Sequence, residues 1–406
     1  MGRWCRLSGT GVFLFDVGLF QKLPGFEEDF HFSLLPFWGN FCLADFMLAN
    51  VRGNDDTEVT IVLDESSRAA SLALSARWKK PVARVHFLEG GLEELARLIS
   101  ASPSENLVLA SLSSVFVIEP AQLVALASGA GHQVVKISVA RTPLDMYCTQ
   151  KDHAVRLLQS AAERGQGKKR LRESLFEGTL HSAIDLIEDL PGEILFQNDL
   201  MQYYASNMWV IENCQSERYH RIIGRLPELA DRGAESHIAE KGVIKDSWIA
   251  SGVEVEGTVE DSIIFPNVLI RRNAVVSRSV VMNGNRIGAG TEVRSALILP
   301  FTAEVPRTSP NIGDNCAIGA KTSTMKNIDY PAQIRDGMTL VGTNADIPNG
   351  FHAEAASYIA GGVPAAALRR MKVLRRGTSV LDGHAAEAAG KSAPTGARGG
   401  GARTKP

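Results

Sequence analysis

Short apolar runs alternate with amphipathic segments along the first half of the chain. The runs are rich in β-branched residues, and the stretches between them carry apolar residues at helical spacing. Strands that alternate with helices in this way are typical of β–α–β units, in which helices cover both faces of a parallel sheet. We therefore predict an α/β domain over residues 1–215. Its predicted strands are 59–63, 81–87, 106–110 and 134–139, and its predicted helices are 66–77, 92–99 and 120–128.

The pattern changes after Gly242. Amphipathic segments of helical length disappear, and clusters of two or three apolar residues recur between Gly, Asn and Asp residues. Tripeptides of one small residue and two apolar residues repeat at spacings of 15, 17 and 16 residues. These tripeptides begin at Ser247, Ser262, Ser279 and Ser295.

A repeat of this length indicates a β-helix. Three hexapeptide-type units form one triangular coil of roughly 16–18 residues, in which each unit points one aliphatic side chain inward. Gly and Asn, as in 287–290 and 312–315, permit the tight corners. The alternative is a meander or sandwich of short strands, which would favour alternation of polar and apolar residues over about 5–6 positions.

We predict the β-helix over residues 242–365, preceded by a linker at 216–241. A C-terminal segment, 366–382, follows it. Residues 383–406 are rich in Ala, Gly, Lys and Arg. They have too few apolar side chains to offset the entropy of ordering, so we expect a disordered tail there.

Composition and charge exclude several classes of protein. The 406 residues are 45% hydrophobic and 22% charged, and the formal net charge is −2. A nucleic-acid-binding protein would usually carry a basic surplus. The cysteines are far apart, so we expect neither a disulfide framework nor a zinc site, and a reducing cytoplasm fits best. They are Cys5, Cys42, Cys148, Cys214 and Cys316.

The N-terminal segment lacks the pattern of a targeting signal. Asp16 interrupts the apolar run 12–15, and no small-residue cleavage pattern follows. No stretch of the chain reaches the ~18 apolar residues that a membrane span needs. We therefore expect a cytoplasmic protein that binds neither membranes nor nucleic acid.

Four segments, in order, resemble those of glucose-1-phosphate adenylyltransferase (ADP-glucose pyrophosphorylase). Residues 36–50, PFWGNFCLADFMLAN, resemble the family's "PFGGKYRLIDFxLSN", and residues 146–152 resemble "GIYxFxKD". Residues 203–208, YYASNM, resemble "YYxANM", and residues 243–266 resemble the entry to the family's β-helix. The resemblance implies a shortened, Rossmann-like nucleotidyltransferase domain followed by a left-handed parallel β-helix of hexapeptide coils.

The family's reaction brings ATP and glucose 1-phosphate together, so it needs cations and metal-binding carboxylates to offset charge. The family's Gly-rich loop with its Arg has a weak counterpart here, residues 8–12, which no Arg follows. The family's Lys ahead of "PFGG" falls near residues 32–33, Phe-Ser. Its two metal-binding Asp residues align with Ser113 and Phe196. Its segment with a Glu-Lys pair for the sugar phosphate is reduced to residues 141–145.

We therefore assign no catalytic, cofactor-binding or metal-binding residue from the sequence, and we expect no cofactor. The resemblance implies a non-catalytic, regulatory subunit of glucose-1-phosphate adenylyltransferase in glycogen or α-glucan synthesis. Its expected partner is a catalytic paralogue or a second copy of itself, bound through the β-helix.

Two alternatives stay open. One is an active nucleotidyltransferase with a rearranged site, which would make ADP-glucose with Mg²⁺. The other is a scaffold protein or a hexapeptide acyltransferase, for which His352 is the candidate base within 242–365. We expect His352 to face solvent, and the pair at 220–221 to lie on a solvated face or a domain contact. The basic pairs at 271–272 and 369–370 could bind an anion, although exposed basic pairs are usually solvated.

Overall fold

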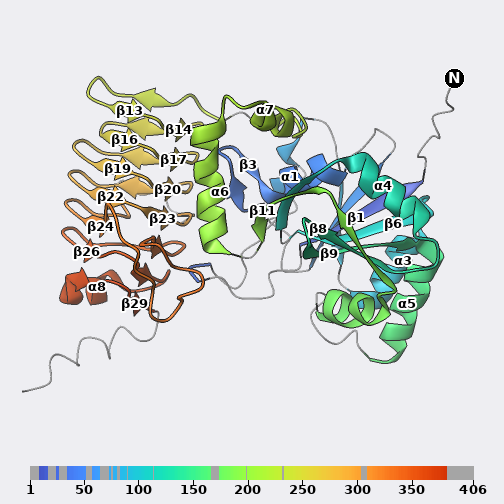
Figure 1. The fold of residues 1–406 in the computed structure, drawn as a ribbon. Coiled ribbons are helices and arrows are strands. Elements are labelled where there is room, and N and C mark those ends of the chain that lie inside the picture. Colours follow the sequence, from blue (N-terminus) through green and yellow to red (C-terminus); the bar gives the residue numbers. More distant parts are fainter. Residues whose placement is uncertain are drawn as a thin grey trace, which may run out of the picture.

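The computed structural model has two domains side by side, an α/β domain and a β-helix (Figure 1). None of the helices it describes is long and apolar enough to cross a membrane. The described residues are 9–16, 24–26, 34–51, 57–64, 73–74, 76–79, 83–88, 90–112, 114–165, 173–197, 199–230, 233–302 and 309–381.

A seven-stranded sheet, in the order β10-β8-β9-β6-β1-β4-β5, forms the centre of the α/β domain. Helices cover both of its faces, as the sequence pattern predicted: α3 and α5 pack on one face, and α1 and α4 on the other. The strands are β1 (Thr10–Asp16), β4 (Glu58–Asp64), β5 (Arg84–Leu88), β6 (Asn106–Ser111), β8 (Val135–Val139), β9 (Thr142–Gln150) and β10 (Leu186–Leu190). The helices are α1 (Leu43–Val51), α3 (Gly91–Ser100), α4 (Pro120–Gly129) and α5 (Lys151–Glu163), and a π-helical turn follows at Glu173–Leu180.

The individual predictions in this domain fare well. The strands expected at 59–63, 106–110 and 134–139 and the helices at 92–99 and 120–128 are present within one or two residues. The strand expected at 81–87 is β5, shifted toward its C-terminal end. Most of the helix expected at 66–77 lies outside the described residues.

The sheet is parallel, as predicted, except at one strand. β9 lies between β6 and β8 and runs antiparallel to both. The reason is local: only Ala140 and Arg141 connect β8 to β9, and both have positive φ, 49° and 64°. A two-residue loop with positive φ at both positions is the turn that joins antiparallel strands, whereas a parallel connection needs a long crossover.

The α/β domain also contains a two-stranded sheet. β7 (Ser114–Ile118) pairs antiparallel with β11 (Gly192–Gln197). Next come α6 (Leu200–Asn213) and α7 (Glu217–Ile223), both within or beside the predicted linker region. α6 lies along the β-helix and contacts its strands β17 (Ile263–Ile264) and β20 (Val280–Val281) (Figure 1).

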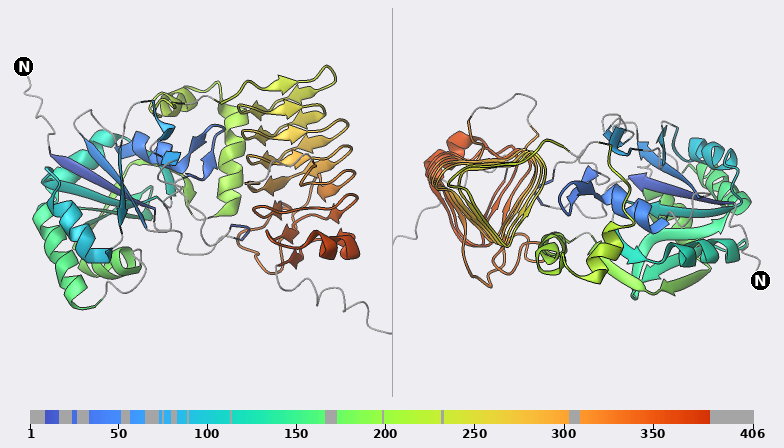
Figure 2. Two further views of the ribbon diagram at one scale, coloured as in Figure 1. Left: turned by 180° about the vertical axis from the view of Figure 1, so that it is seen from behind. Right: turned by 90° about the horizontal axis from the view of Figure 1, so that it is seen from above.

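The β-helix consists of three parallel sheets that form a triangular stack (Figure 2). Its strands begin before and end after the predicted limits of 242 and 365, from β12 (His237–Ile238) to β29 (Ser379–Val380). The inward aliphatic residues of successive coils lie in register, for example Ile244, Val259, Val276 and Val293. The handedness of the coils stays a prediction. The first sheet contains β12, β15 (Glu254–Val255), β18 (Leu269–Ile270) and β21 (Arg286–Ile287). The second contains β13 (Val243–Lys245), β16 (Thr258–Glu260), β19 (Val275–Ser277), β22 (Glu292–Arg294), β24 (Ala317–Gly319), β26 (His352–Ala353) and β28 (Val373–Leu374). The third contains β14 (Trp248–Ile249), β17, β20, β23 (Ala296–Ile298), β25 (Thr339–Val341), β27 (Tyr358–Ile359) and β29.

The repeated serine has a structural reason. The hydroxyl oxygen of Ser262 accepts a hydrogen bond from the backbone N–H of Ser279 in the next coil, at 3.1 Å. The same hydroxyl donates to the backbone oxygen of Glu260, at 2.6 Å. Ser247 and Ser279 make the equivalent bonds, so the hydroxyls link consecutive coils at one corner.

The fourth predicted repeat is one residue out of register. Ala296, not Ser295, donates its backbone N–H to Ser279, and Leu297 pairs with Val280. Ser295 instead occupies the preceding corner position, with φ of 48° beside the 45° of Arg278. The two corner residues, Arg278 and Ser295, are 17 positions apart. The sequence pattern therefore grouped Ser295, a corner residue, with the serines whose hydroxyls link consecutive coils.

Candidate functional site

The carboxyl edge of the central sheet is where a parallel sheet of this kind binds ligands. β1, β4 and β6 end there, at Asp16, Asp64 and Ser111; in the register Asp16 pairs with Leu63, and Ser111 pairs with Phe15. Asp16 is buried, and the buried Ser111 hydroxyl has no hydrogen-bond partner among the residues that the structure describes. The residues that follow β1, 17–23, lie outside the described part.

The weak Gly-rich candidate lies at the opposite edge. Gly9 and Gly11 flank the first residue of β1, and Gly11 pairs with Glu58 and Leu107 inside the sheet. A phosphate-binding loop follows a strand and leads into a helix, whereas this segment precedes its strand. Residues 9–12 therefore begin the strand and form no phosphate cradle; Ser8, like residues 32–33, is outside the described residues.

Of the two positions aligned with metal-binding carboxylates, the structure describes Phe196, which lies on β11. Phe196 pairs with Val115, and Gln197 pairs with Ser114, which immediately follows position 113. Ser113 itself lies outside the described residues. Phe196 is fully buried, and its ring packs edge-on against that of Tyr203 at a centroid distance of 5.8 Å. An apolar ring therefore fills the place where the resemblance implies a carboxylate, and the described residues contain no cluster of three or more His, Cys, Asp or Glu suited to a metal.

The segment expected to carry the sugar-phosphate contacts is a tight hairpin. Ala140 and Arg141 form its turn, and β9 begins at Thr142. The Arg141 backbone N–H donates to the Asp189 carboxylate at 2.8 Å, and the Ser138 hydroxyl donates to it at 2.6 Å. Both hydrogen bonds lower the pKa of Asp189, and the bond from Ser138 has the larger effect. They fasten the hairpin to the edge strand β10.

By contrast, residues of the segment 36–50 make many hydrogen bonds within the fold. The carboxylate of Asp45 is buried and accepts hydrogen bonds from the Arg77 guanidinium (Nε at 3.0 Å), the Trp78 indole (2.8 Å) and the Cys42 backbone N–H (2.8 Å). Arg77 also donates to the Asn40 backbone oxygen at 2.6 Å. Burial raises the pKa of the Cys42 thiol to about 12, so this thiol stays protonated near neutral pH.

Trp38, from the same segment, joins the α/β domain to α6. Its indole N–H donates to the Ser206 backbone oxygen at 2.8 Å, and its backbone N–H donates to the Asn207 side chain at 3.1 Å. Its ring stacks on Trp209 at 5.3 Å and 18°. The next residue, Gly39, has φ of 80°, and a Cβ there would come within 2.5 Å of the Trp248 indole nitrogen in the β-helix.

The start of α6 is fastened to the β-helix by polar contacts. Asp199 caps the helix by accepting the Met201 backbone N–H at 2.8 Å, and it pairs with Arg335 at 2.9 Å. The side chain of Gln333 accepts the Leu200 backbone N–H at 2.9 Å. Arg335 and Gln333 belong to an insertion between β24 (Ala317–Gly319) and β25 (Thr339–Val341).

The YYASNM segment supplies two further contacts from α6. The Tyr203 hydroxyl donates to the Pro36 backbone oxygen, and the Tyr204 hydroxyl donates to the Arg278 backbone oxygen. Burial raises the pKa of Tyr204 to about 12, which keeps its hydroxyl protonated as a donor. Both tyrosines that the resemblance identified therefore serve the domain junction.

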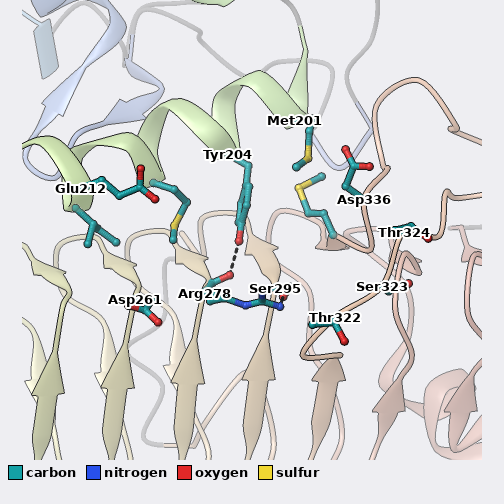
Figure 3. A pocket seen from close by; sticks show the side chains of 13 residues that line it. Met201, Tyr204, Glu212, Asp261, Arg278, Ser295, Thr322, Ser323, Thr324 and Asp336 are labelled. Atoms are coloured by element: carbon teal, nitrogen blue, oxygen red, sulfur yellow. Dashed lines mark hydrogen bonds between the residues drawn. The ribbon is translucent and has the colours of Figure 1, made fainter.

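A groove of about 850 Å³ runs between α6 and the β-helix (Figure 3). Thioether and aromatic side chains from α6 line one wall, among them Met201, Tyr204 and Met208. Corner residues of successive coils, Asp261, Arg278 and Ser295, line the other. The sequence analysis missed this groove, because its two walls are about 70 residues apart in the chain. The regular spacing of the corner residues, which have positive φ, could have identified the wall that the β-helix forms.

The remaining residues singled out from the sequence lie apart from both regions. His220 and Arg221 are exposed on α7, where Arg221 pairs with Glu217 at 3.3 Å. His352 is exposed on β26 (His352–Ala353), as predicted. The basic pair 271–272 contacts Glu256, and the pair 369–370 is exposed at the end of α8 (Ala365–Met371).

Comparison with known proteins places the clearest similarity in the β-helix. The family model described as "GlmU-like, C-terminal hexapeptide" matches residues 232–327. A glucose-1-phosphate adenylyltransferase of Acetivibrio thermocellus is 29% identical over 114 residues, which are 28% of this chain and 25% of that protein.

Two further relatives bear the same name. That of Desulfitobacterium hafniense is 22% identical over 148 residues, 36% of this chain and 33% of the relative. That of Bacillus thuringiensis is 36% identical over 62 residues, 15% of this chain and 16% of the relative. The alignments thus span a third or less of each relative's length. With the α/β domain and the hexapeptide β-helix, they confirm the resemblance predicted from the sequence: over part of its length, this chain is similar to glucose-1-phosphate adenylyltransferases.

Proposed function

We propose that this chain is a non-catalytic, regulatory subunit that assembles with a catalytic glucose-1-phosphate adenylyltransferase and acts in glycogen or α-glucan synthesis. Similarity to that enzyme supports a relationship to nucleotidyltransferases. The finer proposal of a subunit without catalysis rests on Phe196 of β11 and on the hairpin between β8 and β9.

The observation that carries the proposal is the burial of Phe196. A phenyl ring offers no charge to a metal ion, and its packing against Tyr203 leaves no solvent-exposed surface on the residue. Transfer of a nucleotidyl group between two polyanions depends on metal ions and cations that offset the phosphate charges.

The two-residue hairpin at Ala140 and Arg141 supports the same proposal. It leaves no room in the chain for the long segment that, by the resemblance, would hold the sugar phosphate. Meanwhile, the segments at 36–50 and 203–208 keep their contacts with α6 and the β-helix. A chain that retains its assembly framework and lacks its charged site is suited to bind a catalytic subunit and bias its conformational equilibrium.

Co-expression tests the proposed partnership. The catalytic glucose-1-phosphate adenylyltransferase of the same genome would carry an affinity tag, and this chain would be untagged. We expect the two chains to co-elute at a fixed ratio, and the complex to respond to effectors differently from the catalytic chain alone. Tag-only bait is the control. Separate elution together with an unchanged effector response would contradict the proposal.

A further inference from the structure

The C-terminal part of the chain carries an excess of positive charge. Residues 369–406 contain nine Lys or Arg residues and two Asp or Glu residues, although the formal net charge of the whole chain is −2. The net charge therefore hides a division of the chain into a long acidic part and a short basic part. Such an asymmetry is typical of a basic region that binds an anionic partner.

The folded portion of this basic part is the last layer of the β-helix, at the end of the stack opposite β13 (Figure 1). It consists of α8, β28 and β29 and exposes five cationic side chains, Arg369, Arg370, Lys372, Arg375 and Arg376. Within the described part of the chain, Arg376 pairs with Glu354 at 3.8 Å, and the other four side chains have no acidic partner. Cations gathered in this way repel one another, so a negatively charged surface would stabilise them.

Exposed aliphatic side chains lie among these cations. Val373, the first residue of β28, is 40% exposed. On the insertion between β24 and β25, Ile328 is 69% exposed and Met325 is 38% exposed, and the exposed Lys326 lies between them in sequence. This insertion contacts the last layer: a Cβ at Gly377 would be 3.5 Å from the Met325 Cε and 3.8 Å from the Ile328 Cγ1. Residues 325–328 and 369–376 therefore form one surface, the basic end, which presents both apolar and cationic side chains.

We propose that the basic end binds the surface of membranes that contain anionic phospholipids. Basic side chains are attracted to the negative surface of such a membrane, and exposed aliphatic side chains enter the boundary between headgroups and acyl chains. The strength of binding grows with both contributions. Residues 383–406, which lie outside the described part, follow the basic end in sequence and add four Lys or Arg residues. The whole-chain composition and the lack of a membrane span led us to expect no membrane binding, but a peripheral contact needs neither a basic chain nor a span.

Nucleic acid is the other polyanion that a basic surface attracts. Proteins that bind single strands combine cations with aromatic side chains on which the bases stack. Residues 369–406 contain no Phe, Trp or Tyr, and the exposed apolar side chains of the basic end are Val373, Met325 and Ile328. The observations therefore favour a lipid surface over RNA. The inference does not rest on the proposed function, because it requires neither a catalytic partner nor a loss of catalysis.

Flotation of the full chain with phospholipid vesicles tests the binding. We expect the chain to bind vesicles of equal parts phosphatidylcholine and phosphatidylglycerol and not vesicles of phosphatidylcholine alone. Binding should weaken as salt is raised, because salt screens the charges. Arg369→Glu with Arg370→Glu should lower the partition coefficient at least about tenfold. Lys241→Glu with Lys245→Glu makes the same change in net charge on the first coil, where both lysines are exposed, and should bind as the wild type does.

A second pair of variants tests the apolar contribution. Ile328→Gln should lower the partition coefficient about threefold to tenfold, because a polar amide does not enter the acyl boundary. Ile187→Gln is the matched control, since Ile187 is 57% exposed on β10 in the other domain, and it should bind as the wild type does. Thermal melting checks that each variant is folded. Arg369→Gln with Arg370→Gln replaces the charge reversal if the latter fails to fold.

Four results would overturn the proposal. The first is equal binding to both kinds of vesicle, or binding to neither. The second is unchanged binding by the folded charge-reversal variant, which would assign the contact to residues 383–406 alone. The third is release from the vesicles by inorganic phosphate at constant ionic strength, which would indicate a site for a small anion. The fourth is binding of a labelled single-stranded RNA, followed by fluorescence anisotropy, that depends on Arg369 and Arg370 and takes the place of vesicle binding.

Discussion

The carboxyl edge of the central sheet and the junction between the domains differ in what they retain from the family resemblance. At the edge, a two-residue turn stands where the resemblance implies a long segment, and on β11 the buried Phe196 stands where it implies a carboxylate. At the junction, Asp45 binds Trp78, and hydrogen bonds of Trp38 and Tyr203 link residues 36–38 to α6. Tyr204 links α6 to the β-helix. The residues that match the family are those that the fold itself needs. The resemblance therefore reflects a shared architecture.

If this comparison is right, the largest effect comes from the junction. Asp45→Asn should lower the free energy of unfolding by about 3–5 kcal/mol, because the Arg77 guanidinium loses its charged partner. Urea unfolding followed by tryptophan fluorescence measures this, and Trp38, Trp209 and Trp248 lie at the junction. Glu228→Gln, which removes an exposed pair with Lys79, is the control and should change stability by less than about 1 kcal/mol. Equal changes in the free energy of unfolding for the two variants would contradict a structural role for Asp45.

A second variant separates close packing from backbone strain. Gly39→Ala should destabilise by about 2–4 kcal/mol, because the residue has positive φ and its Cβ would press on the Trp248 indole. Gly165→Ala has a similar φ of 76° with nothing within 4 Å of the added Cβ, and it should cost about 1–2 kcal/mol. The difference measures how tightly the two domains fit. If both variants lose the same stability, the contact between Gly39 and the β-helix is loose.

A smaller effect is expected at the start of α6. Asp199→Ala should destabilise by about 1–2 kcal/mol, because it removes both a helix cap and the ion pair with Arg335. Ser216→Ala removes the cap of α7, whose side chain accepts the Tyr219 backbone N–H, and should cost about 1 kcal/mol or less. In an Arg335→Met background, the two cap variants should become alike. A persistent excess for Asp199 would show that the ion pair contributes nothing to the junction.

The smallest effect is predicted at the sheet's edge. Ser111→Ala should leave stability unchanged or raise it by up to about 1 kcal/mol, because the buried hydroxyl has no partner in the described chain. Ser114→Ala, at the first residue of β7, provides a comparison. A clear loss of stability for Ser111→Ala would indicate that the hydroxyl has a partner at this edge, and would weaken the contrast with the junction.

The sequence predicted the coils well and their register less well. The clusters of two or three apolar residues fix the inward positions, since each coil repeats the same three strands. They could not distinguish Ser295, a corner residue with positive φ, from Ser262 and Ser279, whose hydroxyls bond to the next coil. The residue type is the same in both places, and only the backbone conformation and the next coil separate them.

The α/β domain was predictable where strands are long and buried. β9 was missed as an antiparallel strand because Ala140 and Arg141 form a positive-φ turn without the Asn or Gly that usually signals one. The pair β7 and β11 was missed because its partners are about 75 residues apart. The resemblance alone pointed to Phe196 as a position where the family has a carboxylate. Only the structure shows that its ring packs against Tyr203.

Turnover by the purified chain alone is the most direct test of the proposed loss of catalysis. The chain would be incubated with ATP, glucose 1-phosphate and Mg²⁺, and release of pyrophosphate and formation of ADP-glucose would be followed together. An intact glucose-1-phosphate adenylyltransferase in the same assay is the positive control. We predict no turnover above the protein-free background. A rate within roughly a hundredfold of ordinary kcat values, about 1–10³ s⁻¹, would contradict a non-catalytic role.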